Sequence, residues 1–332
     1  LNLNDLTLTT GLFSSSNSNT RTIAFGTTGS IVTTTTTAAQ TVLNMATATN
    51  FTFTGTSNIS AAMSVTRTFN FGGTAGAAAS NRLNINLTSG ASVPTFTGSF
   101  RQINFTGSTS NPGSQSILCH GFTLASGGTY SATSFQTLGT GTLTYTGKTI
   151  STFSLGAGTG GFTTTLTDAG INSTMLIRNG TLDLAGFTLT SGSASTATGT
   201  KDITFNGGTF ILSGSGATVW NNAQPTNFTT TAGTGTGTIS MTAATAKTFV
   251  GGGSTYNCTL NQGGAGTLTI TGANTFNDIA NTNATASQIT FPASTTTTVN
   301  NFTLSGTSGN LVSIRSSTPA TQFTLSKSSG TV

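Results

Sequence analysis

The sequence has very little charge. Only 5% of its 332 residues are Asp, Glu, Lys or Arg, and glutamate is absent. Helix surfaces normally carry Glu, Lys, Arg and Gln, so this absence argues against helical layers. The ten basic residues and five aspartates are spread along the chain, without a run of adjacent positive charges. Nucleic-acid binding usually needs a concentrated basic face, so we expect no nucleic-acid partner.

Cysteine and histidine are also scarce. Cys119 and Cys258 lie far apart and outside any Cys-x-x-Cys or Cys/His spacing, so we expect buried core residues rather than a zinc site. A disulfide would form only if the fold brought them together. His120 directly follows Cys119. Adjacent strand residues point to opposite faces, so this pair is a poor candidate for a Cys-His nucleophile.

Long apolar runs are missing, and so is a clear cofactor motif. No apolar stretch approaches the roughly 20 residues that span a bilayer, so we expect no membrane insertion. Gly156, Gly158 and Gly161 match Gly-x-Gly-x-x-Gly, but a chain with 43 glycines contains such a match by chance, and no helical pattern follows it. We therefore expect no bound cofactor and no metal.

What the sequence does contain favours strands and turns. Thr, Ser, Asn, Gly and Ala make up most of it, and 34% of the residues are hydrophobic, with 22 Phe among them. Thr, Phe, Ile and Val favour strands, whereas Gly, Asn and Ser favour turns. A chain of this length with this apolar content can bury a core. The composition predicts a folded, nearly all-β protein.

Two short patterns recur at regular spacing. Gly-Thr followed by alternating apolar residues begins at Gly180, Gly208, Gly237 and Gly266, at intervals of 28, 29 and 29 residues. A basic residue that leads into apolar-x-apolar recurs at Arg21, Arg67, Arg101, Lys148, Lys201 and Lys247. Such periods indicate a stacked array of supersecondary units. We interpret the first pattern as a coil-forming unit, and the basic residues as protection for coil edges that also keeps the chain in solution.

These patterns predict a right-handed parallel β-solenoid with coils of roughly 20 to 30 residues. Residues 1–332 would form one continuous solenoid, and the chain, which begins at Leu1 rather than Met, is expected to be a piece of a longer one. The alternative is a tandem array of β-sandwich modules. We expect at most a short helix, around residues 38–46. Function would then be sought in loops near residues 107–114, 191–200 and 220–225.

The second half of the chain also resembles a known group of sequences. The segments that carry the resemblance are Ala246-Lys247-Thr248-Phe249-Val250-Gly251-Gly252-Gly253, Leu268-Thr269-Ile270-Thr271-Gly272-Ala273-Asn274-Thr275-Phe276, and Phe323-Thr324-Leu325-Ser326-Lys327. They look like a Thr/Gly-rich β-solenoid repeat family that recurs in virion-associated and adhesin-like proteins of bacteriophages. The phrases at Arg21, Arg67 and Lys201 are similar. The resemblance implies a virion surface protein and brings no catalytic residues with it.

Aspartates are the residues to inspect for enzymatic chemistry. Some phage tailspikes are β-solenoid enzymes that cut polysaccharide with paired carboxylates, and such pairs lie about 5 to 10 Å apart. Asp168, Asp183 and Asp202 are close enough in sequence for neighbouring coils to bring two of them to one face. Isolated Asp in turns and at strand ends is the commoner case, so we favour structural roles. A glycan would instead contact Trp220, Lys201 or Arg178.

The function predicted from the sequence is structural. We expect a bacteriophage tail fibre, spike or capsid decoration that lies on the virion surface and adheres to a host cell-surface glycan or protein. Its partners would be other virion proteins and further copies of itself, with a trimer among the options. The alternatives are a polysaccharide-degrading enzyme that uses the aspartates and a bacterial cell-surface adhesin or filament subunit.

Overall fold

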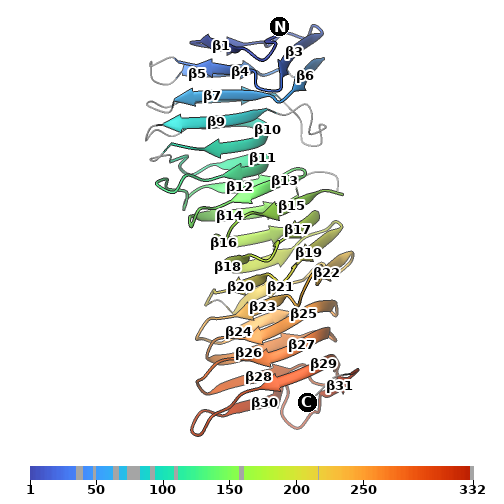
Figure 1. Cartoon of the computed structure of the whole chain (residues 1–332). Helices are drawn as coiled ribbons and strands as arrows, with labels where there is room; N and C mark the ends of the chain where they lie inside the picture. Colours follow the sequence, from blue (N-terminus) through green and yellow to red (C-terminus); the bar gives the residue numbers. More distant parts are fainter. Residues whose placement is uncertain are drawn as a thin grey trace. The chain divides into compact units, whose positions relative to one another are not determined.

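The computed structural model describes residues 1–34, 40–47, 50–62, 67–72, 83–89, 94–107, 111–156, 161–215 and 217–329. Within these ranges the regular elements are β-strands, and there is no helix, hence none that could cross a membrane. The strands pair in parallel and stack as the successive rungs of a β-solenoid (Figure 1). The predicted solenoid is confirmed, and β-sandwich modules are excluded because sandwiches are built from antiparallel sheets.

The chain forms two compact units, Leu1–Thr164 and Thr165–Val332. The strands of unit 1 are β1 (Thr7–Thr10), β2 (Phe13–Ser14), β3 (Arg21–Gly26), β4 (Ser30–Thr33), β5 (Gln40–Met45), β6 (Phe51–Gly55), β7 (Asn58–Ala62), β8 (Arg67–Phe71), β9 (Asn84–Ser89), β10 (Thr95–Phe105), β11 (Ser116–Thr123), β12 (Ser134–Thr137), β13 (Gly141–Thr144) and β14 (Thr149–Leu155). β15 (Thr163–Leu166) includes the boundary between the units.

A ladder of buried apolar residues runs through unit 1. Ile31 pairs with Ile59, which pairs with Ile85 and then Ile103, and the ladder continues through Phe122 and Leu143. All six are fully buried. Because side chains alternate across a strand, the polar neighbours of these residues face outward. The core is therefore a stack of equivalent positions.

Strand β10 turns a corner between two sheets. Its first residues, Thr95–Gly98, pair with β8, and its later residues pair with β9 and β11. At the corner Gly98 has φ +95°, and a Cβ there would lie 1.5 Å from the carbonyl oxygen of Phe71. Both the left-handed backbone and the close approach of another rung require glycine.

Replacing Gly98 by alanine should lower the free energy of unfolding by about 2 kcal/mol or more, since backbone strain and a backbone clash add. Gly147→Ala is the matched control, because Gly147 also has a positive φ, +73°, but an added Cβ would meet nothing within 4 Å. We expect a cost of about 1 kcal/mol there. Urea denaturation followed by circular dichroism measures both, and equal losses would contradict this account of the corner.

Unit 2 has the same construction. Its strands are β16 (Gly170–Ile177), β17 (Gly180–Asp183), β18 (Thr188–Thr196), β19 (Lys201–Thr204), β20 (Thr209–Leu212), β21 (Thr218–Asn221), β22 (Phe228–Thr231), β23 (Thr238–Met241), β24 (Lys247–Val250), β25 (Thr255–Gln262), β26 (Gly266–Thr271), β27 (Thr275–Asn281), β28 (Ser287–Phe291), β29 (Thr296–Leu304), β30 (Val312–Ser316) and β31 (Thr324–Lys327). One apolar ladder consists of Leu189, Phe210, Ile239, Leu260, Ile279 and Phe302.

The repeated Gly-Thr pattern does not form one ladder. Its copies lie in β17, β20, β23 and β26, and of these only β20 and β23 pair directly. β17 pairs with β19, and β26 pairs with β24 and β28. Along the apolar ladder, successive partners are separated by 21, 29, 21, 19 and 23 residues. A coil therefore varies in length, while the pattern marks the start of strands on different faces.

Two local predictions were wrong. The expected helix at residues 38–46 lies partly outside the described residues, and Gln40–Met45 forms β5, which pairs with β8. The expected loop at residues 191–200 is strand as far as Thr196. In both places pairing with neighbouring rungs outweighs weak local preferences. Residues 108–110, within the expected loop at 107–114, lie outside the described residues.

Candidate functional site

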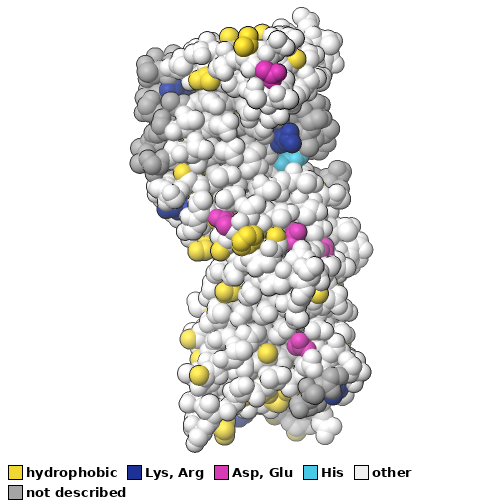
Figure 2. All heavy atoms as spheres, in the orientation of Figure 1, with side chains coloured by type: hydrophobic (Ala, Val, Ile, Leu, Met, Phe, Trp, Pro, Cys, Tyr) yellow, Lys and Arg dark blue, Asp and Glu magenta, His cyan; other side chains and the backbone are white. Residues whose placement is uncertain are grey.

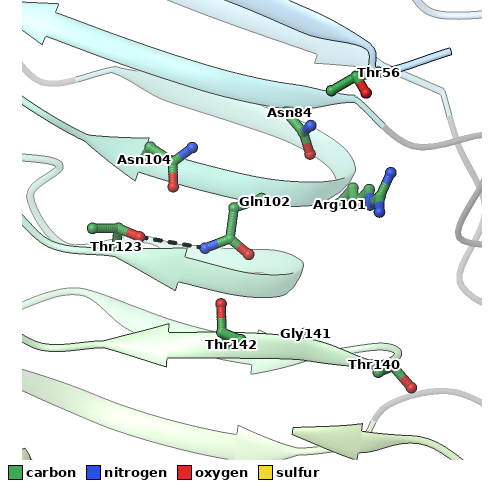
Figure 3. Close-up of a pocket in the computed structure, with 9 residues that line it drawn as sticks. All are labelled: Thr56, Asn84, Arg101, Gln102, Asn104, Thr123, Thr140, Gly141 and Thr142. Carbon is green, nitrogen blue, oxygen red and sulfur yellow. Dashed lines mark hydrogen bonds between the residues drawn. The ribbon is translucent and has the colours of Figure 1, made fainter. Parts of the chain in front are cut away.

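The candidate site is an open groove of about 470 Å³ on the outer face of unit 1 (Figure 3). Its volume is in the range of small-molecule binding sites. The groove is lined by Thr56, Asn84, Arg101, Gln102, Asn104, Thr123, Thr140, Gly141 and Thr142. These residues come from successive rungs, so the groove crosses several strands. We call it the amide groove.

Strand alternation explains why amides line this groove. Asn84 and Gln102 are aligned partners on β9 and β10, and Asn86 and Asn104 are the next aligned pair. The isoleucines between them point into the core, so these amides point outward. Successive rungs of a sheet lie about 4.8 Å apart. The groove therefore presents hydrogen-bonding groups at a short, regular spacing along the stack.

The amides are held by neighbouring rungs. Asn104 Nδ2 donates to Asn86 Oδ1 at 2.8 Å, and Asn84 Nδ2 approaches Asn58 Oδ1 at 3.4 Å. Gln102 Nε2 lies 3.5 Å from the hydroxyl of Thr123, as Figure 3 shows. A primary amide offers two donor hydrogens and two acceptor lone pairs, so one bond to a neighbour leaves others for a ligand. Such groups suit a ligand rich in hydroxyls.

A glycine allows close packing of the rungs beside the amide groove. Gly121 is the aligned partner of Gln102 on the following rung. A Cβ at Gly121 would lie 2.3 Å from the carbonyl oxygen of Thr142 and 2.4 Å from Gln102 Oε1. The space that a side chain would need at this position is therefore already occupied by Thr142 and by the amide of Gln102.

Arg101 supplies the only charge among the described residues that line the amide groove. It is exposed and lies just after the corner of β10, beside Asn84 in Figure 3. The strand register places it level with His120, whose buried ring lies against Gly139. Carboxylates and aromatic rings are both absent from the described lining. The groove is thus polar, positively charged at one side and without a stacking platform.

Unit 2 has a second open depression, of about 450 Å³. It is lined by Pro225, Thr226, Phe228, Thr229, Thr230, Gly252, Gly253, Ser254, Thr255 and Asn257. Asn257 is fixed there, because its backbone N–H donates to Thr230 Oγ1 and its Nδ2 to Thr230 O, both at 2.7 Å. This depression adjoins the segment 220–225 that was singled out from the sequence. It carries no charged side chain among its described lining residues.

Trp220 lies in the core of unit 2. Its side chain is fully buried, is stacked on Phe249 with ring centroids 5.7 Å apart, and donates from Nε1 to the hydroxyl of Tyr256 at 3.0 Å. Tyr256 donates in turn to Gly251 O. A buried indole has no exposed face for a sugar ring, so Trp220 serves packing rather than glycan contact in this structure.

The repeated basic residues have an unexpected structural role. Lys201 and Lys247 are fully buried, each at the first position of its strand. Lys201 Nζ donates to Gly199 O at 2.8 Å and to Thr226 O at 3.1 Å. Arg67 is also the first residue of a strand and buried. These three residues cannot provide solubility, and Lys201 cannot contact a glycan, because none of them reaches the surface.

Lys247 binds two successive turns at once. Its ammonium donates to Ala243 O and Ala265 O, both at 2.7 Å, and lies 3.3 Å from Gly264 O. The two turns follow β23 and β25. Burial lowers the pKa of Lys247 to about 8, because the charged form loses its hydration.

The contribution of Lys247 to the stability of unit 2 should therefore rise as the pH increases from about 8 to about 10.5. Across this window the unfolded chain keeps a proton on Lys247 that the folded chain has released, and stability rises wherever the unfolded state binds more protons. Below pH 8 both states are protonated, so this contribution is constant. Denaturation of wild type and Lys247→Met at pH 7, 8, 9 and 10 isolates the effect. Equal pH slopes in the two proteins would contradict it.

Two of the aspartates predicted as catalytic candidates, Asp183 and Asp202, form hydrogen bonds within unit 2. Asp183 and Asp202 lie on paired strands, where Asp202 aligns with Thr181 and Asp183 with Thr204, so both face outward on the same sheet. Asp202 accepts from the hydroxyls of Thr204, Thr229 and Thr231 at 2.6, 2.7 and 3.0 Å. Asp183 Oδ1 accepts from Ala185 N and Asn206 Nδ2, each at 2.8 Å. The carboxylates thus connect neighbouring rungs.

The remaining candidates lie apart from both depressions. Asp168 is half-buried in the turn before β16, and Arg178 is exposed just after that strand. Cys119 and Cys258 are buried and are not joined in a disulfide, and burial raises the pKa of Cys258. Within the described ranges, no group of three or more His, Cys, Asp or Glu side chains is placed to hold a metal ion.

Sequence reasoning missed the amide groove, although its signal is visible in the chain. Asn84-Ile85-Asn86 and Gln102-Ile103-Asn104 both place an amide on each side of a core isoleucine. Their alignment depends on a coil of only 18 residues, shorter than the expected 20 to 30. The nature of the site rests on this geometry, because no protein-family model, curated protein sequence or solved structure matches the chain.

Proposed function

We propose that this protein is a structural component of a bacteriophage surface, a tail fibre, spike or capsid decoration, that adheres to the host cell surface. The observation that carries the adhesive role is the amide groove, where hydroxyl and amide groups from several rungs converge on an open, aromatic-free surface. Figure 2 shows a face with few charged side chains, scattered among uncharged polar groups. Such contacts are weak singly, and many copies on one particle would make them sufficient.

The assignment to a phage particle rests on the resemblance of the Thr/Gly-rich repeats. Its test is electron microscopy of intact particles with a gold-labelled antibody against this chain. We expect label on the particle surface, with association to other virion proteins or to further copies of the chain. If the chain is expressed in the lysate but the particles carry no label, the proposal is overturned.

A polysaccharide depolymerase is the second candidate, favoured by the placement of Asp183 and Asp202 on one outward face. If these carboxylates were catalytic, incubation with host surface polysaccharide should release oligosaccharides, and Asp183→Asn or Asp202→Asn should stop the release. We favour adhesion because the oxygens of both residues already accept hydrogen bonds from neighbouring rungs.

A further inference from the structure

We propose that the amide groove binds an anionic polysaccharide, with the sugar hydroxyls on its amide and threonine groups and an acid group of the polymer on Arg101. This inference rests on the proposed adhesive function and names the class of ligand. It concerns unit 1, whereas all three glycan-contact residues predicted from the sequence belong to unit 2.

The positive charge of the groove favours an acidic ligand. Arg101 is exposed, and its guanidinium has no hydrogen-bond partner within the described part of the chain. The described lining contains no carboxylate that would neutralise it. Arginine presents a planar fork of donors that matches the two oxygens of a carboxylate. The net charge of +5 adds a weak general attraction for polyanions.

The neutral part of the groove selects a polymer of hydroxylated units. Asn84 and Gln102 stand one rung apart in register, and Thr142 lies in the same register two rungs after Gln102, with Gly121 between them. The spacing of about 4.8 Å between rungs is comparable to the length of one pyranose unit. An extended chain of sugars along the stack would therefore meet a polar side chain on three of these four rungs. Amides and hydroxyls both donate and accept, as sugar hydroxyls do.

Because the described lining has no aromatic residue, we expect low affinity for the ligand. Sugar-binding sites gain affinity from apolar faces packed on aromatic rings, and no such ring lines the described groove. Affinity must then come from hydrogen bonds and from Arg101, so a single site should be weak and sensitive to salt. A protein present in many copies per particle tolerates weak sites.

The experiment is binding of the purified full chain to a panel of immobilised oligosaccharides bearing uronate, sialate, sulfate or no charge. Arg101→Gln removes the charge of the groove, and Arg315→Gln, at an exposed arginine of unit 2, is the matched control. We expect binding to acidic members, weakened about tenfold or more by Arg101→Gln, since a charge-assisted hydrogen bond contributes at least that factor. Arg315→Gln should bind like wild type, and the uronate, sialate and sulfate arms identify the acid group.

Two results would overturn the inference while leaving the proposed function intact. One is binding to neutral glycans alone. The other is binding to acidic glycans that Arg101→Gln leaves unchanged or that Arg315→Gln weakens equally. If no member binds, the inference also fails, and antibody labelling of particles then decides separately whether the chain is a virion surface protein. Circular dichroism of both variants shows that each is folded.

Discussion

Replacing Trp220 by alanine is expected to lower the free energy of unfolding of unit 2 by about 3 to 5 kcal/mol, the usual cost of truncating a large buried aromatic residue. Trp220 is fully buried, and its ring lies within about 6 Å of the rings of Phe210, Phe228, Phe249 and Tyr256. Truncation would open a cavity among four aromatic neighbours that belong to different strands. It would also leave the Tyr256 hydroxyl without one donor.

Trp220→Phe is the matched control. Phenylalanine keeps a ring against Phe249 but loses the Nε1 hydrogen bond to Tyr256, so we expect a loss of about 1 to 2 kcal/mol. Urea denaturation followed by far-ultraviolet circular dichroism measures all three proteins without relying on tryptophan fluorescence. If Trp220→Ala unfolded within 1 kcal/mol of wild type, the ring would not be the packing centre that the structure indicates.

Replacing Lys247 by methionine should lower the free energy of unfolding by about 3 kcal/mol at pH 7. Methionine fills a similar volume but donates no hydrogen bond, so the carbonyls of Ala243 and Ala265 would be buried without their donor. An unsatisfied buried polar group costs about 1 to 3 kcal/mol. The loss at neutral pH and the rise in the contribution of Lys247 above pH 8 are compatible, because a neutral amine still donates to these turns.

Lys327→Met is the control for Lys247→Met, since Lys327 is exposed on β31. Surface substitutions usually change stability by less than about 0.5 kcal/mol, and we expect no more here. Thermal and urea denaturation of the two variants should therefore differ clearly. Equal stability of the two would mean that Lys247 does not hold the turns together.

The fold could be predicted from the sequence because its main determinants are local and repeated. Alternation at Ile103 and Phe105, or at Leu268 and Ile270, identifies strands without knowledge of their partners. The low charge removed helical layers from consideration, and short regular spacing favoured a stack over separate modules. The register between paired strands was harder to predict, because coil length varies and the repeated Gly-Thr pattern can start strands on different faces.

The site could not be predicted in the same way because it depends on alignment between rungs. Gln102 and Thr123 form part of one groove only once β10 and β11 are paired in the observed register. Burial could also not be predicted from the local sequence. Lys201 stands out in a weakly charged sequence and Trp220 is its one tryptophan, so both suggest surface chemistry, yet both are enclosed by turns and strands distant in sequence.

The most direct test of the account is to pass the anionic polysaccharide over the immobilised chain and to measure both its retention and the length of the eluted polymer. We predict that the wild-type chain retains the polymer and that the eluted polymer keeps its original length. Arg101→Gln should abolish this retention, whereas Asp183→Asn and Asp202→Asn should leave it unchanged. A polymer shortened by wild type and left intact by Asp183→Asn or Asp202→Asn would contradict it, and would identify an enzyme instead of an adhesive surface.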